Sequence, residues 1–252
     1  MIKTFSAFVV AAFAMVASAS AVPAERPVSV VLVHGAFVDG SGWQRVYNIL
    51  RRDGYEVIVT QNSTATLDGD VATVTDAIAR ARHPVVLIGH SYGGMVITEA
   101  GTDPKVRALG YIAAFAPDVG ESVASLIAEP VANAGQVPIL PPQDGFLTLD
   151  VARFPTSFAA DADLTTTRFM AASQVPWGVA AVNTRIDRAA WRNKPTFYMI
   201  TLNDHMVATP QQRVMARRAN ATVTEIASSH AVMLSHPTQV VAYIERIAAT
   251  VH

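Results

Sequence analysis

Residues 89 to 94 read Gly-His-Ser-Tyr-Gly-Gly and directly follow the apolar run from Pro84 to Ile88. A serine between glycines, placed between a strand and a helix, is typical of a sharp turn with a strained serine backbone. The strain lifts the serine hydroxyl clear of the sheet, where a base can reach it. Glycine and serine are common in turns of every kind, so the pattern indicates a nucleophile only if the chain also supplies a base and an acid.

His230 and Asp204 are the candidates for base and acid. Ser91 is a poor nucleophile at its own pKa and needs a base to accept its proton. Neutral imidazole can take that proton near neutral pH and return it to the leaving group, which suits His230. Asp204 would hold the imidazole tautomer and stabilise the imidazolium that forms. Asp118, which also follows a predicted strand, is the alternative acid.

Two backbone amides are predicted to stabilise the negative charge of a tetrahedral intermediate. They are the N–H groups of Ala36 and Tyr92, and the loss of one such donor typically slows a reaction by about 100- to 1,000-fold. We expect His34 to make a structural hydrogen bond beside this loop, and the side chain of His90 to point away from the pocket. The residues expected to line an apolar substrate pocket are Phe37, Met206 and Met233.

The elements that must position these residues alternate along the chain. Predicted strands cover residues 28–33, 56–60, 85–89, 108–113, 196–201 and 222–226, and predicted helices cover 42–52, 70–82, 92–101, 210–220 and 238–249. Apolar strands that alternate with amphipathic helices indicate an α/β fold with a parallel sheet covered on both faces. Ligands bind beyond the carboxyl ends of such strands. The Ala36 loop, Ser91, Asp204 and His230 each follow a predicted strand and should meet at one rim.

Residues 118 to 193 interrupt the alternation. No strand pattern recurs there, and prolines cluster at Pro138, Pro141, Pro142 and Pro155. An insertion of this length within a compact domain is usually functional. We expect a helical cap that folds over the carboxyl ends of the strands.

Composition narrows the class of protein. The chain has 252 residues, a hydrophobic content of 51%, a charged content of 15% and a net charge of −1, which excludes disorder and argues against nucleic acid as a partner. It has no cysteine, so disulfides and thiolate chemistry are excluded. No metal-ligand spacing and no glycine-rich nucleotide loop is present, so we expect neither a metal nor another cofactor.

Residues 1 to 21 are predicted to be a signal peptide, and residues 22 to 252 the mature domain. Lys3 precedes an apolar run of about a dozen residues and a small-residue exit, as in secretory signals. Cleavage after Ala19 and cleavage after Ala21 both fit, and Ala21 is favoured. We therefore expect export, to a bacterial periplasm or the medium, and no stable membrane insertion after cleavage. An uncleaved N-terminal anchor is the alternative.

Four segments resemble the α/β-hydrolase branch that holds plant methylesterases, hydroxynitrile lyases and bacterial carboxylesterases. They are Val30 to Trp43, Gly89 to Gly94, Asn203-Asp204-His205 and Ser229 to Leu234. The chain order Ser, Asp, His is also that of α/β-hydrolase triads. The resemblance implies this fold, a triad of Ser91, Asp204 and His230, and oxyanion amides at Ala36 and Tyr92.

Two positions depart from the lyases of this branch. Those enzymes have threonine where this chain has Gly35 and lysine where it has Ala231, and these side chains handle the cyanohydrin hydroxyl and the cyanide charge. Their absence favours ester hydrolysis. The predicted signal peptide also departs from the mostly cytosolic plant relatives, which argues against a hormone-ester substrate.

The sequence thus predicts a serine hydrolase that cleaves carboxylic esters of small apolar substrates through an acyl-enzyme on Ser91. A lactonase, a lyase or a cofactor-free oxidative activity on the same scaffold is the alternative enzyme, since fold does not fix reaction. A ligand-binding protein with a vestigial triad is the alternative from another class. The particular ester and the oligomeric state are left open.

Overall fold

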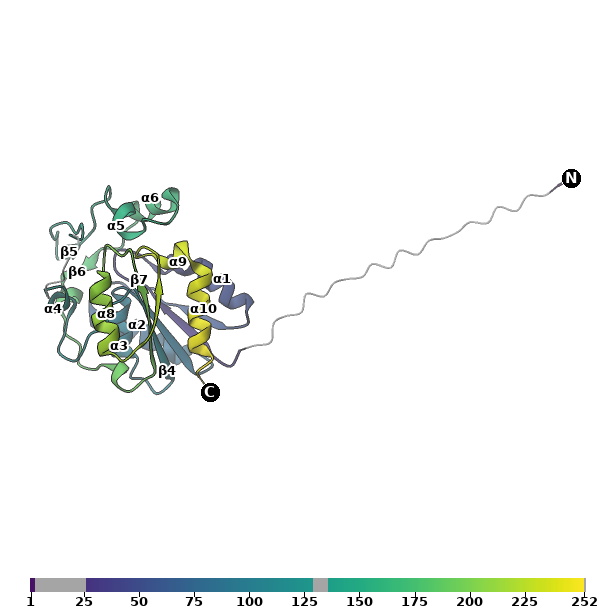
Figure 1. Ribbon diagram of the computed structural model, residues 1–252, viewed down its shortest axis with the longest axis horizontal. Coiled ribbons are helices and arrows are strands. Elements are labelled where there is room, and N and C mark those ends of the chain that lie inside the picture. Colours follow the sequence, from purple (N-terminus) through teal and green to yellow (C-terminus); the bar gives the residue numbers. More distant parts are fainter. Residues whose placement is uncertain (3–25, 129–135, 252) are drawn as a thin grey trace.

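A six-stranded parallel sheet forms the centre of the computed structural model, which describes residues 1–2, 26–128 and 136–251 (Figure 1). The strand order is β2-β1-β3-β4-β7-β8. The strands are β1 (Ser29–Val33), β2 (Glu56–Val59), β3 (Val85–His90), β4 (Val106–Ile112), β7 (Thr196–Thr201) and β8 (Thr222–Ile226). Every residue of β1 and β3 is buried, as expected for apolar strands covered on both faces.

Helices pack on both faces of this sheet. Helices α1 (Gln44–Arg52) and α10 (Pro237–Ala248) lie together on one side, and α2 (Leu67–Arg80), α3 (Gly93–Ala100) and α8 (Thr209–Arg218) lie on the other (Figure 1). Short helices join them: η1 (Gly40–Trp43), η2 (Ala190–Arg192) and α9 (Val232–Ser235). The predicted alternation of strands and helices is confirmed.

The register of the sheet brings the carboxyl ends of its strands to one rim. Val33 of β1 pairs with Gly89 of β3, and His90 pairs with Ile112 of β4. Farther along, Thr201 of β7 pairs with Ile226 of β8. The loops that follow β1, β3, β7 and β8 therefore leave the sheet on the same side, as predicted.

Within its described residues, the segment 118–193 contains four α-helices, the short helix η2 and one small sheet. The α-helices are α4 (Val123–Ala128), α5 (Phe154–Phe158), α6 (Leu164–Ala172) and α7 (Val179–Asn183). The expectation that it holds no strand is wrong, because β5 (Phe146–Leu147) pairs antiparallel with β6 (Trp177–Gly178). Strands of two residues are too short to produce an alternating pattern. Helices α5 and α6 stand above the rim of the main sheet (Figure 1).

Residues 3–21 of the predicted signal peptide lie outside the described residues. Within the described part of the chain, no helix is long and apolar enough to cross a membrane. Export stays a prediction.

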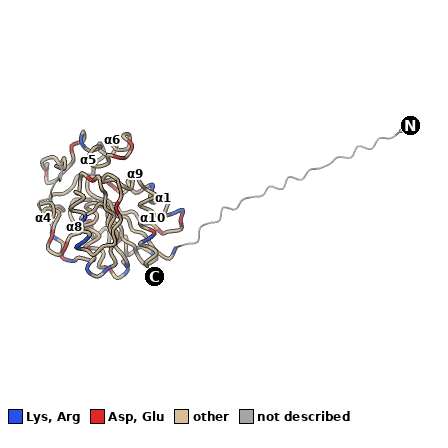
Figure 2. Tube along the Cα trace, in the orientation of Figure 1, with Lys and Arg blue, Asp and Glu red and all other residues tan. Residues whose placement is uncertain are grey.

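Residues with positive and negative side chains alternate along the outer parts of the chain trace (Figure 2). Several of them form ion pairs, such as Arg192 with Asp118 at 2.7 Å and Arg218 with Glu121 at 2.6 Å. That the chain does not bind nucleic acid stays a prediction.

Glu56 in β2 is hydrogen-bonded both to β1 and to Arg82, in the segment before β3. Its carboxylate accepts hydrogen bonds from the Ser29 hydroxyl and, at 2.8 Å each, from the backbone N–H and Nε of Arg82. Burial acts to raise the pKa of Glu56, but these hydrogen bonds outweigh it and lower the pKa from 4.5 to about 2. The carboxylate therefore stabilises the fold above its unfolded-state pKa, and this contribution is lost as pH falls through the folded-state pKa.

We expect Glu56→Gln to lower the free energy of unfolding by about 1–3 kcal/mol near neutral pH, because a charged acceptor with three partners is lost. The difference from wild type should shrink as pH falls from 4.5 toward 2, where the wild-type carboxylate takes up its proton. Urea unfolding at a series of pH values measures this. Glu225→Gln is the control, since the exposed pair with Arg213 should contribute little. A pH-independent difference would contradict the assignment.

Candidate active site

Ser91 sits in a strained turn between β3 and α3. Its φ is 54°, a left-handed conformation that non-glycine residues rarely adopt. Glycines allow the close packing that holds it there. A Cβ at Gly93 would lie 2.7 Å from the carbonyl oxygen of Val33, and one at Gly94 would lie 2.0 Å from that of Phe115. The predicted strand-to-helix turn is therefore present, and Ser91 itself is 8% exposed.

Asp204 and His230 form a buried hydrogen-bonded pair. The imidazole Nδ1 lies 2.8 Å from Oδ2 of Asp204, and both side chains are fully buried. The two residues come from the loops after β7 and β8, which are neighbours in the sheet. The structure thus joins the predicted acid and base.

The carboxylate of Asp204 accepts further hydrogen bonds. Oδ1 accepts from the backbone N–H groups of Met206 and Val207, at 2.8 and 2.9 Å, and Oδ2 accepts from the side chains of Thr201 and Gln212, at 2.7 and 2.9 Å. Burial acts to raise the pKa of Asp204, but the nearby imidazole and these donors outweigh it and lower the pKa. Asp204 is therefore a carboxylate at neutral pH.

Sequence reasoning did not single out Gln212 or Thr201. Gln212 is completely buried and lies on the same face of α8 as Met215 and Ala216. A lone glutamine in an otherwise apolar helical stripe is the one signal that could have found it. Thr201 is the last residue of a predicted strand and gives no comparable signal.

His230 is surrounded by aromatic rings. Its ring centroid lies 4.6 Å from that of His90 and 4.9 Å from that of Phe158. The Nε2 of His90 donates to the carbonyl oxygen of His230 at 3.0 Å. The Nε2 of His230 is buried and has no hydrogen-bond partner among the described residues. His230 therefore lies against the residue that precedes Ser91, with its second nitrogen unengaged.

The sequence predicts that the side chain of His90 points away from the pocket, and His90 is not among the residues that line the pocket of about 320 Å³ described below. Its ring packs between His230 and Trp43 and lines a small cavity. Burial lowers the pKa of His90 well below its ordinary value, so its ring is neutral.

Two other candidates, His34 and Asp118, have structural partners, and so has His236 near the His230 loop. The ring of His34 accepts from the N–H of Asn62 at 2.9 Å and contacts the carbonyl oxygen of Gly35 at 2.8 Å, so the predicted structural role is confirmed. Asp118 makes two hydrogen bonds to Arg192, at 2.8 and 2.7 Å, and does not contact His230. His236 contacts the Ser235 hydroxyl at 2.8 Å at the start of α10.

Ala36 lies in the loop after β1, and Tyr92 directly follows Ser91 in the chain. Both are buried, and no acceptor is recorded for either backbone N–H among the described residues. Gly35 sets the spacing between these two segments. A Cβ at Gly35 would lie 2.6 Å from the Cβ of Ser91. The space between position 35 and Ser91 therefore has no room for a side chain on residue 35.

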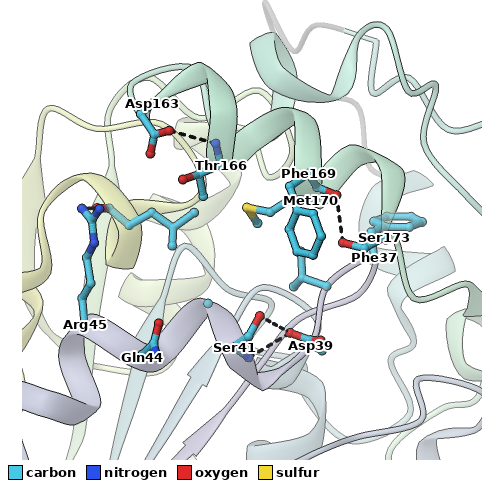
Figure 3. A pocket seen from close by; sticks show the side chains of 13 residues that line it. Phe37, Asp39, Ser41, Gln44, Arg45, Asp163, Thr166, Phe169, Met170 and Ser173 are labelled. Atoms are coloured by element: carbon cyan, nitrogen blue, oxygen red, sulfur yellow. Dashed lines mark hydrogen bonds between the residues drawn. The ribbon is translucent and has the colours of Figure 1, made fainter.

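A pocket of about 320 Å³ lies between α6 and the loop that leads into η1 (Figure 3). Phe169 and Met170 of α6 face Asp39 and Ser41 across it (Figure 3). Of the predicted pocket residues, Phe37 lines this pocket, Met233 lines a smaller cavity of about 10 Å³ beneath it, and Met206 lines neither of the two. The two cavities share five lining residues: Val38, Asp39, Gly42, Met170 and Leu234.

No group of three or more acidic or histidine side chains in the described ranges is placed to hold a metal ion.

A family model for alpha/beta hydrolases matches residues 30–243. The chain belongs to the alpha/beta hydrolase family. The fold class predicted from the sequence is confirmed by this match together with the parallel sheet.

Individual relatives carry esterase and hydrolase names, which confirms the resemblance to an esterase branch. The chain is 36% identical over 111 residues to a carbendazim hydrolyzing esterase of Nocardioides sp. (strain SG-4G), a match that spans 38% of this chain and 46% of that protein. The structure of a pyrethroid hydrolase from Sphingobium faniae JZ-2 matches with a TM-score of 0.77 at 22% sequence identity. The match covers 88% of this chain and 98% of the pyrethroid hydrolase chain. A methylesterase from Arabidopsis has a TM-score of 0.74 at 18% identity, with coverage of 89% and 100%.

We expect Gly35→Ala to slow catalysis by about 100-fold or more, because the new Cβ must push Ser91 or the Ala36 loop out of position. Steady-state kinetics on p-nitrophenyl butyrate, with circular dichroism to confirm folding, measure the effect. Gly69→Ala is the matched control, since a Cβ there meets only the Thr66 hydroxyl at 2.9 Å. Wild-type turnover in Gly35→Ala would show that this close approach does not matter.

Proposed function

We propose that this alpha/beta hydrolase is a carboxylic ester hydrolase that works through an acyl-enzyme on Ser91. The observation that carries the proposal is the buried Asp204–His230 hydrogen bond beside the strained serine turn. A serine at such a turn needs a nearby base, and a buried imidazole needs an ionised partner to carry a transient positive charge. The proposal is supported by the ionised partner that Asp204 gives the imidazole and by the contact of His230 with His90, the residue before Ser91.

Each residue has one role in the proposed reaction. His230 takes the proton of the Ser91 hydroxyl as its oxygen attacks the ester carbonyl carbon, and then gives that proton to the departing alcohol. A water molecule, deprotonated by the same imidazole, then attacks the acyl carbon. The bond to Ser91 Oγ breaks, the acid is released, and the imidazole returns its proton to the Ser91 oxygen. Asp204 keeps the Nδ1 proton facing itself, so that the unengaged Nε2 is the basic nitrogen.

The N–H groups of Ala36 and Tyr92 are proposed to stabilise the oxyanion of each tetrahedral intermediate. Neither has a recorded acceptor, and Gly35 lets the two segments approach each other. Amides fixed in this way need no reorganisation when charge develops, which makes them effective in a buried site.

The substrates are proposed to be esters of small apolar acids or alcohols. Phe37 follows Ala36 directly and lines the pocket under α6, where Phe169, Met170 and Leu234 add apolar surface. The relatives named carbendazim hydrolyzing esterase, pyrethroid hydrolase and methylesterase support an ester substrate. Gly35 also disfavours lyase chemistry, because its surroundings leave no room for the threonine side chain of the hydroxynitrile lyases.

Ser91→Ala should lower turnover of p-nitrophenyl butyrate by about 10⁴-fold or more, since the nucleophile is lost. The wild-type protein should release an initial burst of p-nitrophenol that is stoichiometric with enzyme, because acylation and deacylation are separate steps. Stopped-flow absorbance measures both. Thr75→Ala, which removes an exposed hydroxyl from α2, should behave as wild type. Full turnover by Ser91→Ala would refute the mechanism.

We also propose that residues 1–21 direct export of the chain. Expression of the full chain in a bacterium should yield a periplasmic or secreted protein whose first residue is Val22, because a signal peptidase cleaves after small residues such as Ala21. N-terminal sequencing and mass spectrometry of each cell fraction test this. An intact N-terminus in the cytoplasmic fraction would contradict it.

A further inference from the structure

The loop after β8 carries His230, and Asp204 holds only the imidazole ring of that residue. The backbone of the loop needs supports of its own. On the sheet side, the N–H of Asn203 donates to the carbonyl oxygen of Ser228 at 3.0 Å. The Nε2 of His90 donates to the carbonyl oxygen of His230 at 3.0 Å. Further supports come from α5 and the segment between α5 and α6, which stands above the rim (Figure 1).

Asp161 of that segment accepts three hydrogen bonds from the loop. Its Oδ2 accepts from the backbone N–H of Ser229 at 2.9 Å and from the Ser228 hydroxyl at 2.7 Å, and its Oδ1 accepts from the Ser229 hydroxyl at 2.5 Å. Ser229 is 2% exposed, so without this carboxylate its N–H and its hydroxyl would be buried with no acceptor among the described residues. Hydrogen bonds to an ionised carboxylate are about twice as strong as neutral ones.

Phe158, at the end of α5, contacts the same loop beyond His230. Its carbonyl oxygen accepts from the N–H of Ala231 at 3.0 Å, and its ring packs edge-on against the His230 ring at 4.9 Å. Residues 158–161 therefore bind both chain neighbours of His230, Ser229 on one side and Ala231 on the other.

The charge state of Asp161 fits this arrangement. Partial burial acts to raise its pKa, but the hydrogen bonds from Ser229 and Ser228 outweigh it and lower the pKa. The ring of His236 faces the carboxylate, with Nδ1 3.7 Å from Oδ2 of Asp161. The Ser235 hydroxyl lies between them, 2.8 Å from His236 and 3.2 Å from the Ser228 hydroxyl.

We propose that Asp161 is a positioning residue, which fixes the backbone of the His230 loop and so aligns the imidazole with Ser91 and Asp204. The inference rests on the proposed role of His230 as the base. Asp161 does not touch the reacting atoms and acts through Ser228 and Ser229. A misplacement of about 1 Å in a catalytic group can cost about 100-fold in rate.

The test compares Asp161→Ala with Asp150→Ala as the matched control. Asp150 belongs to the same insertion and also accepts backbone hydrogen bonds, from Ala152 and Arg153, but it has no recorded bond to the His230 loop. With p-nitrophenyl acetate, Asp161→Ala should lower kcat by about 10- to 100-fold while KM changes by less than about 3-fold. Asp161→Asn keeps one acceptor oxygen and should fall between Asp161→Ala and wild type. Asp150→Ala should keep the wild-type kcat.

A second readout does not depend on turnover. In wild type, the Nδ1 proton of His230 should give a downfield proton NMR signal, because it is hydrogen-bonded to a buried carboxylate. Asp161→Ala should broaden or shift that signal while near-ultraviolet circular dichroism stays native-like. An unchanged signal and an unchanged kcat in Asp161→Ala would overturn the inference, as would an equal loss of kcat in Asp150→Ala. Full activity in His230→Ala would instead refute the proposed function, whatever the NMR signal shows.

Discussion

The site depends above all on the buried hydrogen bond between Asp204 and His230. Removing an ionised carboxylate from water is costly, so this residue is tolerable only with partners for its oxygens. Thr201, Gln212 and two backbone amides provide them in addition to the imidazole. The arrangement fixes one imidazole nitrogen toward Asp204 and leaves the other unengaged. Rotation of the ring would leave a buried carboxylate without one of its partners.

The position of Ser91 depends on backbone-to-backbone distances that only glycine permits. A Cβ would lie 2.6 Å from the nearest heavy atom at Gly35, 2.7 Å at Gly93 and 2.0 Å at Gly94, so none of these positions has room for a side chain. These contacts hold the serine at a positive φ and bring the Ala36 loop beside it. The parallel sheet supplies the frame, because its register sends the loops after β1 and β3 out side by side.

The sequence predicted the sheet and the rim because both leave local signals. Buried parallel strands are continuous runs of valine, leucine and isoleucine, and the serine turn is marked by its glycines. Partners that come together only through tertiary packing leave no such signal. Gln212 reaches Asp204 from α8, and Asp161 reaches Ser229 from a segment 68 residues away in sequence. The contact between the rings of His90 and His230 is a further example, because it depends on how the His230 loop packs against the end of β3.

The central claim, that Ser91 is the nucleophile activated by His230, is tested most directly by covalent labelling with a fluorophosphonate and peptide mapping by mass spectrometry. The account predicts a single adduct per chain, on the peptide that contains Ser91, and labelling at least 100-fold slower in His230→Ala because the serine then lacks its base. An adduct on a different residue, or labelling of Ser91 at the wild-type rate in His230→Ala, would contradict it.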